Sequence, residues 1–183
     1  MEIKQTMIEG VEVIETNSII DQRGEFSRLY CDKELAHSIG SRHIVQINHA
    51  RTHAVGTVRG LHYQHSPHME MRFARCVKGR VWDIAVDLRA GSRTLLKWHA
   101  EELTPDNARM LVIPEGCAHG YQVLEANSEL LYLSTAFYAP EFEGGIMYDD
   151  PQLAITWPLP AKYLSVKDVA HPPILEKFSG IRV

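Results

Sequence analysis

Two short runs of residues decide how this chain is interpreted: Arg59-Gly-Leu-His-Tyr-Gln64 and Pro114-Glu-Gly-Cys-Ala-His-Gly120. Each run places a histidine on or beside a predicted strand, next to glycines that allow a tight turn or the close approach of a ligand. The first run also contains an arginine, whose guanidinium fork suits phosphate oxygens. Two such runs in an all-β chain predict a barrel whose mouth binds an anionic small molecule and carries out proton chemistry on it.

Composition narrows the class of protein. The chain has 183 residues, 45% of them hydrophobic and 23% charged, which predicts one globular domain over residues 1–183. No apolar run approaches the ~20 residues of a membrane helix, and the first residues lack a signal-peptide core. The three cysteines have no Cys-x-x-Cys spacing, which favours a reduced, cytoplasmic protein. A net charge of −4 argues against nucleic-acid binding, so any phosphate site is local.

Most of the chain alternates apolar and polar residues, as β-strands do. Strands are predicted at Val11–Thr16, His43–Asn48, Leu95–Leu103, Arg109–Ile113, Tyr121–Leu124 and Leu130–Tyr138. The one convincing helix is Asp32–Gly40, with an acidic start and a glycine stop. Thr104-Pro-Asp-Asn107 predicts a turn. Many short strands at this spacing predict a sandwich or barrel, of which the jelly roll is one form.

The segment Met71–Leu88 predicts a hairpin that turns at Lys78-Gly79. Its second strand divides into two faces. Trp82, Ile84, Val86 and Leu88 share one face, and Asp83, Ala85 and Asp87 share the other. The two aspartates are expected to face solvent or a partner, with Asp83 alternatively lining a pocket.

In these features the chain resembles the cupin-type dTDP-4-dehydrorhamnose 3,5-epimerase family nearly from end to end. Further matching segments are Asp21–Phe26, Gln46–Ala50, Val77–Arg89, Asp149–Pro151, Ile155–Pro158 and Leu164–Asp168, together with Tyr132 and Tyr138. The resemblance implies an all-β double-stranded β-helix (a cupin jelly roll) with one or two short peripheral helices. It also implies a homodimer that needs no metal or organic cofactor and acts on a nucleotide-linked 4-keto-6-deoxyhexose.

The resemblance also implies roles for individual residues. His62 is expected to be the base, Asp168 its orienting partner and Tyr132 the acid that returns a proton to the opposite face of the sugar. Tyr138 is expected to stack on the nucleobase. The remaining substrate-binding residues implied by the family pattern are Arg23, Gln46, Asn48, Arg59, His119, Glu143 and Lys167.

Two positions depart from the family pattern. The family usually has lysine where Arg72 stands beside the sugar, and the bulkier, planar guanidinium can alter sugar geometry. Because the family includes enzymes that invert C3 alone, inversion is expected at C3, with C5 left open. The family usually has glutamate where Arg28 stands, accepting the N3–H of thymine, whereas arginine can only donate. Cytosine presents acceptors instead, so a CDP-linked sugar is favoured over a dTDP-linked one, unless Arg28 turns to a phosphate.

Alternative interpretations stay open. Strand histidines are most often structural, and His53, His65, His68, His99 and His171 are assigned to that class. An ordinary dTDP-4-dehydrorhamnose 3,5-epimerase is the nearest alternative function. A metal-dependent cupin oxygenase is the alternative from another class, although the His-x-His pair of such enzymes is absent. A 3,4-ketoisomerase and a non-catalytic sugar-nucleotide binder rank below these. The nucleobase, the inversion at C5, the final sugar product and the oligomeric state are not determined by these residues alone.

Overall fold

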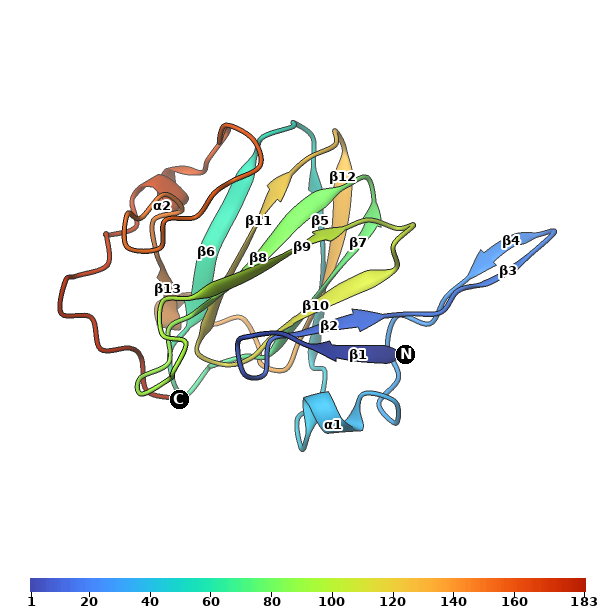
Figure 1. The fold of residues 1–183 in the computed structure, drawn as a ribbon, viewed down its shortest axis with the longest axis horizontal. Helices are drawn as coiled ribbons and strands as arrows, with labels where there is room; N and C mark the ends of the chain where they lie inside the picture. The colour runs from blue at the N-terminus through green and yellow to red at the C-terminus, as the bar shows by residue number, and fades with distance from the viewer.

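The computed structural model describes all residues, 1–183, as two antiparallel β-sheets packed face to face, with a narrow arm projecting from one end (Figure 1). The six-stranded sheet runs in the order β1 (Glu2–Gln5), β2 (Glu12–Glu15), β10 (Arg109–Ile113), β7 (Arg72–Lys78), β12 (Ser128–Ser134) and β5 (Gln46–Thr52). The five-stranded sheet runs in the order β13 (Glu143–Gly145), β6 (Val58–Gln64), β11 (Cys117–Val123), β8 (Val81–Asp87) and β9 (Trp98–Leu103).

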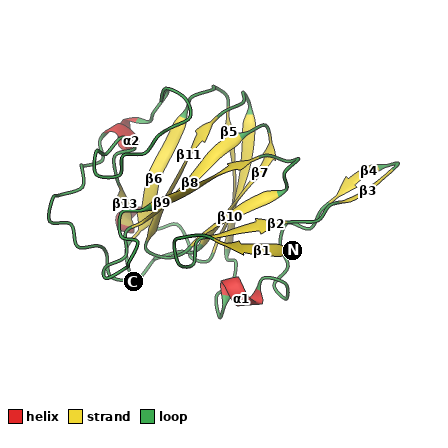
Figure 2. Ribbon diagram, in the orientation of Figure 1, coloured by secondary structure: helices red, strands yellow, loops and turns green.

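Helices are few and short, as Figure 2 shows by the near absence of red. They comprise α1 (Ala36–Ile39), the 3-10 turn η1 (Pro140–Phe142) and α2 (Val166–Val169). The arm is the hairpin β3 (Ile19–Asp21) and β4 (Gly24–Phe26). No helix is long and apolar enough to cross a membrane. The predicted all-β jelly roll with short peripheral helices is therefore confirmed.

The main core lies between the two sheets, where the inward faces of their strands meet. Val13, Ala74 and Leu111 come from the six-stranded sheet, and Ala85 and Val123 come from the five-stranded sheet. All five side chains are at most 4% exposed. Alternation along each strand gives this core its apolar face, which is the packing expected of two sheets.

A second apolar layer covers the outer face of the five-stranded sheet. Ile84 and Val86 of β8 pack there against Trp157 and Phe178 of the C-terminal segment, which wraps that side of the molecule (Figure 1). Both faces of β8 are consequently covered. The expectation that Asp83 and Asp87 face solvent is wrong: both residues are 0% exposed. Their alternation was correctly assigned, but which face would be covered depends on a segment remote in sequence.

The predicted hairpin at Met71–Leu88 is also wrong, although both of its strands exist. β7 pairs with β10 and β12, whereas β8 pairs with β11 and β9. The chain therefore crosses from one sheet to the other at Lys78-Gly79. Gly79 has a φ of +74°, and an added Cβ would lie 2.4 Å from the Ser128 hydroxyl. A turn signal between two alternating segments specifies a change of direction but not the pairing partner.

Two smaller expectations have mixed outcomes. Helix α1 begins later than predicted, at Ala36, and no side chain caps its start, although it stops at Gly40 as expected. The turn at Thr104–Asn107 is confirmed, because the Asn107 side-chain oxygen accepts hydrogen bonds from the backbone of Thr104 and of Arg109. This Asx geometry satisfies backbone donors just before β10 begins.

Candidate active site

The two diagnostic runs become neighbouring antiparallel strands, β6 and β11, with His62 directly opposite His119. Gly60 and Gly120 lie where these two strands come closest. A Cβ added to Gly60 would be 2.6 Å from the Gly120 Cα, and Gly60 has a φ of +131°. Both observations demand glycine, because any side chain would force the strands apart. The glycines therefore serve close backbone approach, which brings the two histidines to one side of the sheet.

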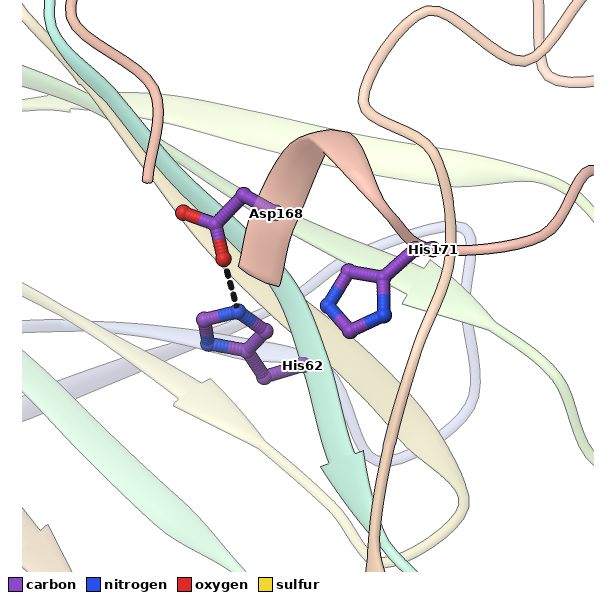
Figure 3. A group of neighbouring side chains, drawn as sticks. All are labelled: His62, Asp168 and His171. Atoms are coloured by element: carbon purple, nitrogen blue, oxygen red, sulfur yellow. Dashed lines mark hydrogen bonds and ion pairs between the residues drawn. The ribbon is translucent and has the colours of Figure 1, made fainter. Parts of the chain in front are cut away.

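His62 forms a hydrogen-bonded pair with Asp168 of α2, with 2.7 Å between His62 Nε2 and Asp168 Oδ1 (Figure 3). The Asp168 side chain is only 4% exposed. Burial acts to raise the pKa of Asp168, but its hydrogen bonds with His62 and Ser165, together with the charge of the imidazole, outweigh burial and lower that pKa. An ionised Asp168 accepts the Nε2–H of neutral His62. Nδ1 is then the ring nitrogen that can take up a proton.

Helix α2 has a local reason to form where it does. Ser165 has extended backbone angles, and its hydroxyl accepts a hydrogen bond from the Asp168 backbone N–H. This is an N-cap three residues before the functional carboxylate. The cap fixes the Asp168 backbone, and the Asp168 side chain reaches His62 of β6.

His119 is held between a buried carboxylate and a guanidinium group. Its Nε2 lies 2.9 Å from Asp83 Oδ1, and its Nδ1 lies 3.2 Å from Arg72 Nη1. A guanidinium only donates, so Nδ1 is the acceptor and the imidazole carries its proton on Nε2, toward Asp83. Arg72 also forms an ion pair with Glu70. The neutral His119 therefore has no spare donor, and the guanidinium of Arg72 is the positive group beside it.

Tyr132 of β12 approaches the same point from the opposite sheet. The centroid of the Tyr132 ring is 5.7 Å from that of His119 and 6.3 Å from that of Tyr121. The guanidinium carbon of Arg72 lies 6.0 Å from the Tyr132 centroid. Burial, reinforced by Tyr121, raises the pKa of Tyr132 well above 10. The phenol is consequently protonated throughout the neutral range and can donate a proton or a hydrogen bond.

These groups line one cavity of about 490 Å³, a size that suits a small organic ligand. Every predicted site residue lines it except Arg23, Arg28 and Gln46; the lining thus includes Asn48, Arg59, Arg72, His119, Tyr138, Glu143 and Lys167 beside His62, Tyr132 and Asp168.

The charges that line the cavity are unequally neutralised. Lys167 forms an ion pair with Glu143, which also accepts a 2.6 Å hydrogen bond from the Tyr138 hydroxyl. Arg72 has Glu70. Arg59 is exposed and forms no ion pair. The cavity therefore presents one uncompensated guanidinium, which is suited to a phosphate group.

Three predicted residues lie outside the cavity. The Gln46 side-chain oxygen accepts a 3.2 Å hydrogen bond from the Tyr138 backbone, so Gln46 supports the rim. Arg23 forms an ion pair with Asp21 within the arm, and Arg28 follows β4 and forms an ion pair with Glu34. Neither arginine is among the residues that line the cavity of its own chain. The arm, which carries Arg23, projects away from the sheets (Figure 1).

The structure adds Tyr121 and His171, which sequence reasoning did not assign to the site, and Asp83, for which a pocket was only the alternative. Tyr121 lines the cavity, and Asp83 orients His119. His171, expected to be structural, lies with its ring 5.5 Å from that of His62 (Figure 3). Burial, together with the nearby His62, lowers the pKa of His171. The only signal for Asp83 was its place on one strand face with Ala85. His171 had no signal, because its approach depends on how the chain returns after α2.

Comparison with known proteins identifies the family of this chain. The family model for dTDP-4-dehydrorhamnose 3,5-epimerase matches residues 5–176. The chain is 37% identical to that enzyme of Sinorhizobium fredii, covering 96% of this chain and 91% of the relative. It is 41% identical to that of Pseudomonas aeruginosa, covering 92% and 93% respectively.

Solved structures extend the likeness. A Legionella pneumophila dTDP-6-deoxy-D-glucose-3,5-epimerase in complex with dTDP-4-keto-L-rhamnose superposes with a TM-score of 0.92 at 37% identity, covering 100% of this chain and 98% of the other. A 3'-monoepimerase of Streptomyces bikiniensis in complex with dTDP-quinovose gives 0.86 at 28% identity, covering 93% and 86%. The chain belongs to the dTDP-4-dehydrorhamnose 3,5-epimerase family and is a sugar-nucleotide epimerase.

Proposed function

We propose that this epimerase acts on a nucleoside-diphosphate-linked 4-keto-6-deoxyhexose and inverts C3 without a cofactor. The proposal rests above all on one observation: the His62–Asp168 pair belongs to the five-stranded side of the cavity, and Tyr132 belongs to the six-stranded sheet facing it. A sugar ring lying between the sheets meets a proton acceptor on one face and a proton donor on the other. That arrangement is what inversion at a carbon requires.

His62 is the proposed base. The 4-ketone acidifies the hydrogen on C3, and Nδ1 of His62 removes it while Nε2–H remains bonded to Asp168. The buried carboxylate holds the tautomer and stabilises the imidazolium that forms. The electrons move into the C3–C4 bond and onto the ketone oxygen, giving an enolate. Arg72 supplies the positive charge that stabilises this oxygen, as a preorganised donor. Tyr132 then delivers a proton to the opposite face of C3.

The nucleotide is proposed to lie toward the cavity mouth. Arg59, with no internal partner, binds the diphosphate, and the half-exposed Tyr138 ring stacks on the base. Lys167 and Asn48 provide further polar contacts from opposite walls. The Glu143–Lys167 pair carries no net charge and positions the Tyr138 hydroxyl.

We also propose a homodimer in which the β3–β4 arm of each copy reaches the cavity of the other. The arm exposes Ile19, Ile20 and Phe26 by 66–76%, far more apolar surface than an isolated hairpin can carry in water. Arg23 and Arg28, expected to bind substrate, lie on or beside this arm and outside the cavity of their own chain. Exchange of arms covers the apolar residues and delivers both guanidinium groups.

A mixing experiment tests the exchange of arms. Arg23→Ala and His62→Asn chains are each expected to have low activity alone. After mixed refolding, a dimer with one chain of each kind has one cavity in which both residues are intact, so part of the activity returns. Mixtures that stay inactive, or a monomer by light scattering, would contradict the arm exchange.

Arg28 supports a CDP-linked substrate over a dTDP-linked one, because a guanidinium cannot accept the N3–H of thymine. Losing that acceptor costs about 1–3 kcal/mol where the base is buried. Arg28→Glu is therefore expected to shift preference toward the dTDP sugar by about tenfold or more. An unchanged preference would remove the cytosine argument.

The second candidate is a dTDP-4-dehydrorhamnose 3,5-epimerase that inverts both carbons, which the names of the relatives favour. Proton NMR in deuterium oxide distinguishes the two. Deuterium entering only C3, with the CDP-linked 4-keto-6-deoxyglucose turned over faster, supports the first candidate. Deuterium entering C3 and C5 of the dTDP-linked sugar establishes the second. Absence of exchange with either sugar would contradict both.

A further inference from the structure

A second imidazole, that of His171, lies against His62, the proposed base. His171 follows α2, and its ring meets that of His62 edge-to-face at an interplanar angle of 71°. Its Nε2 atom is buried and has no hydrogen-bond partner. A buried nitrogen without a hydrogen bond is destabilising, so such an atom calls for a hydrogen-bond partner or a ligand.

The partner can be placed from the neighbouring ligand atoms. One nitrogen each of His62 and His171 and one carboxylate oxygen of Asp168 all lie within 4.8 Å of one another. Figure 3 shows the three side chains converging, with the His171 ring facing the His62–Asp168 hydrogen bond from the side of α2. Ligand atoms on a tetrahedral zinc ion are about 3.3 Å apart, given bonds of 2.0–2.1 Å. Relative movements of no more than about 1.5 Å therefore separate these atoms from tetrahedral spacing.

The backbone is shaped to admit the third ligand. Gly145 of β13 pairs with His62 of β6. A Cβ added at Gly145 would lie 2.1 Å from two atoms of the His171 ring. Only a glycine opposite His62 leaves room for a second imidazole. Nearby, the Glu143 carboxylate is already neutralised by Lys167, so Asp168 is the charge available to an ion.

We propose that His62, Asp168 and His171 form a site for a divalent transition-metal ion of the zinc class, and that an ion bound there switches the epimerase off. Two imidazoles and one carboxylate are ligands that such ions prefer, and the cavity leaves a fourth position for water. The ion is an inhibitor and not a cofactor, since it occupies the group that takes up the substrate proton.

The inhibition follows from the tautomer of His62. A neutral imidazole carries one proton, which lies on Nε2 when Asp168 accepts it. If the metal binds Nε2, the proton moves to Nδ1, and no proton is gained or lost by the ring. Nδ1 then becomes a donor and can no longer accept the C3 hydrogen. This part of the inference rests on the proposed role of His62, whereas metal binding itself does not.

The first measurement is therefore made without substrate. Full-length protein is stripped with a chelator, dialysed and titrated with Co²⁺ while the visible spectrum is recorded. We expect tetrahedral Co²⁺ bands that saturate at one ion per chain and disappear when Zn²⁺ is added. His171→Phe retains an aromatic ring but lacks the nitrogen, and is expected to weaken Co²⁺ binding by about tenfold or more.

Two variants complete the spectroscopic test. Gly145→Ala should displace the His171 ring and weaken Co²⁺ binding to the same extent, although residue 171 is still a histidine. His99→Phe, which removes a histidine paired with Glu101 outside the cavity, is the matched control and should keep the Co²⁺ bands. Bands of unchanged affinity in folded His171→Phe or Gly145→Ala, or no bands in the wild type, would overturn the site.

The second measurement is the C3 exchange rate with and without Zn²⁺, each variant being compared with its own metal-free rate. Wild-type exchange should stop with bound Zn²⁺ and return on addition of EDTA, and His171→Phe should need about tenfold more Zn²⁺ or more. Equal Zn²⁺ sensitivity in both proteins would overturn inhibition through this site. A chain that binds Co²⁺ through His171 but exchanges no substrate proton would instead refute the proposed function and leave the metal site standing.

Discussion

Asp168→Asn is the substitution that tests the proposed chemistry most directly. Asparagine has nearly the same shape, and the Ser165 cap survives because it binds the backbone N–H of residue 168. What changes is the charge facing His62 across 2.7 Å, at a position only 4% exposed. The substitution therefore removes the group proposed to stabilise the imidazolium while leaving the helix in place.

The size of the loss follows from electrostatics. Opposite unit charges about 4 Å apart attract by about 4 kcal/mol at an effective dielectric constant of about 20. That attraction exists only when His62 is protonated, which happens after it removes the C3 proton. Its loss raises the barrier and lowers kcat by about a thousandfold, with little change in KM. Asparagine can also offer its NH₂ group to Nε2, which would favour the wrong tautomer and deepen the loss.

The assay is deuterium incorporation at C3 in deuterium oxide, followed by proton NMR at saturating substrate. Glu101→Gln is the matched control, because it removes the carboxylate partner of His99 outside the cavity. Thermal melting establishes that both variants fold. A loss in kcat of less than about tenfold in folded Asp168→Asn would refute the reasoning, since the buried carboxylate would then contribute little to the transition state.

Further predictions address the acid, the phosphate site, the backbone and pH. Tyr132→Phe should slow epimerisation by about a hundredfold or more but slow deuterium exchange less, and equal losses in NMR would contradict a separate acid. Arg59→Ala should raise KM about tenfold or more with kcat nearly unchanged in steady-state kinetics. Gly60→Ala should lower the unfolding free energy by about 2 kcal/mol more than Gly91→Ala in urea titrations, because Gly91 also has positive φ but open space around it. Burial acts to raise the pKa of Asp87, but hydrogen bonds from Arg89, Ser92 and Thr94 together outweigh it and lower that pKa to about 2. Ionised Asp87 should therefore contribute roughly 2 kcal/mol to the unfolding free energy above pH 4, and this contribution should be lost as pH falls toward 2. In urea titrations at several pH values, Asp87→Asn should reduce the loss of unfolding free energy between pH 4 and pH 2.

Local features of the sequence predicted the fold class well, and the pairing of strands poorly. β10 was predicted with its observed bounds, because an apolar run between turn signals is a local pattern. The hairpin of β7 and β8 failed because each strand finds partners far away in sequence. Asp83 was on the predicted strand face, yet it is buried beside His119. The face that is covered depends on the opposite sheet and on the C-terminal segment, neither of which is readable from β8.

Sequence reasoning likewise found some residues of the candidate site and missed others. His62 and His119 stood out because each has a glycine within two residues, and those two glycines are needed where β6 and β11 come closest. His171 did not stand out, because its contact with His62 requires that the chain return past β13 at a glycine. Arg23 could be assigned to substrate only through the family pattern, and within one chain it lies on the arm.

The sequence by itself determined the kind of protein this is: an all-β enzyme of the epimerase family, whose resemblance to its relatives implies a histidine, a tyrosine and arginines at the site. Those properties belong to residue types at short, fixed spacings. Only the tertiary structure decided which groups share the cavity, that the proposed base and acid come from opposite sides of it, and that Arg59 alone among the lining cations has no partner. The physical reason is that these relations depend on contacts between segments far apart in the sequence, such as His62 with Asp168 at a separation of 106 residues.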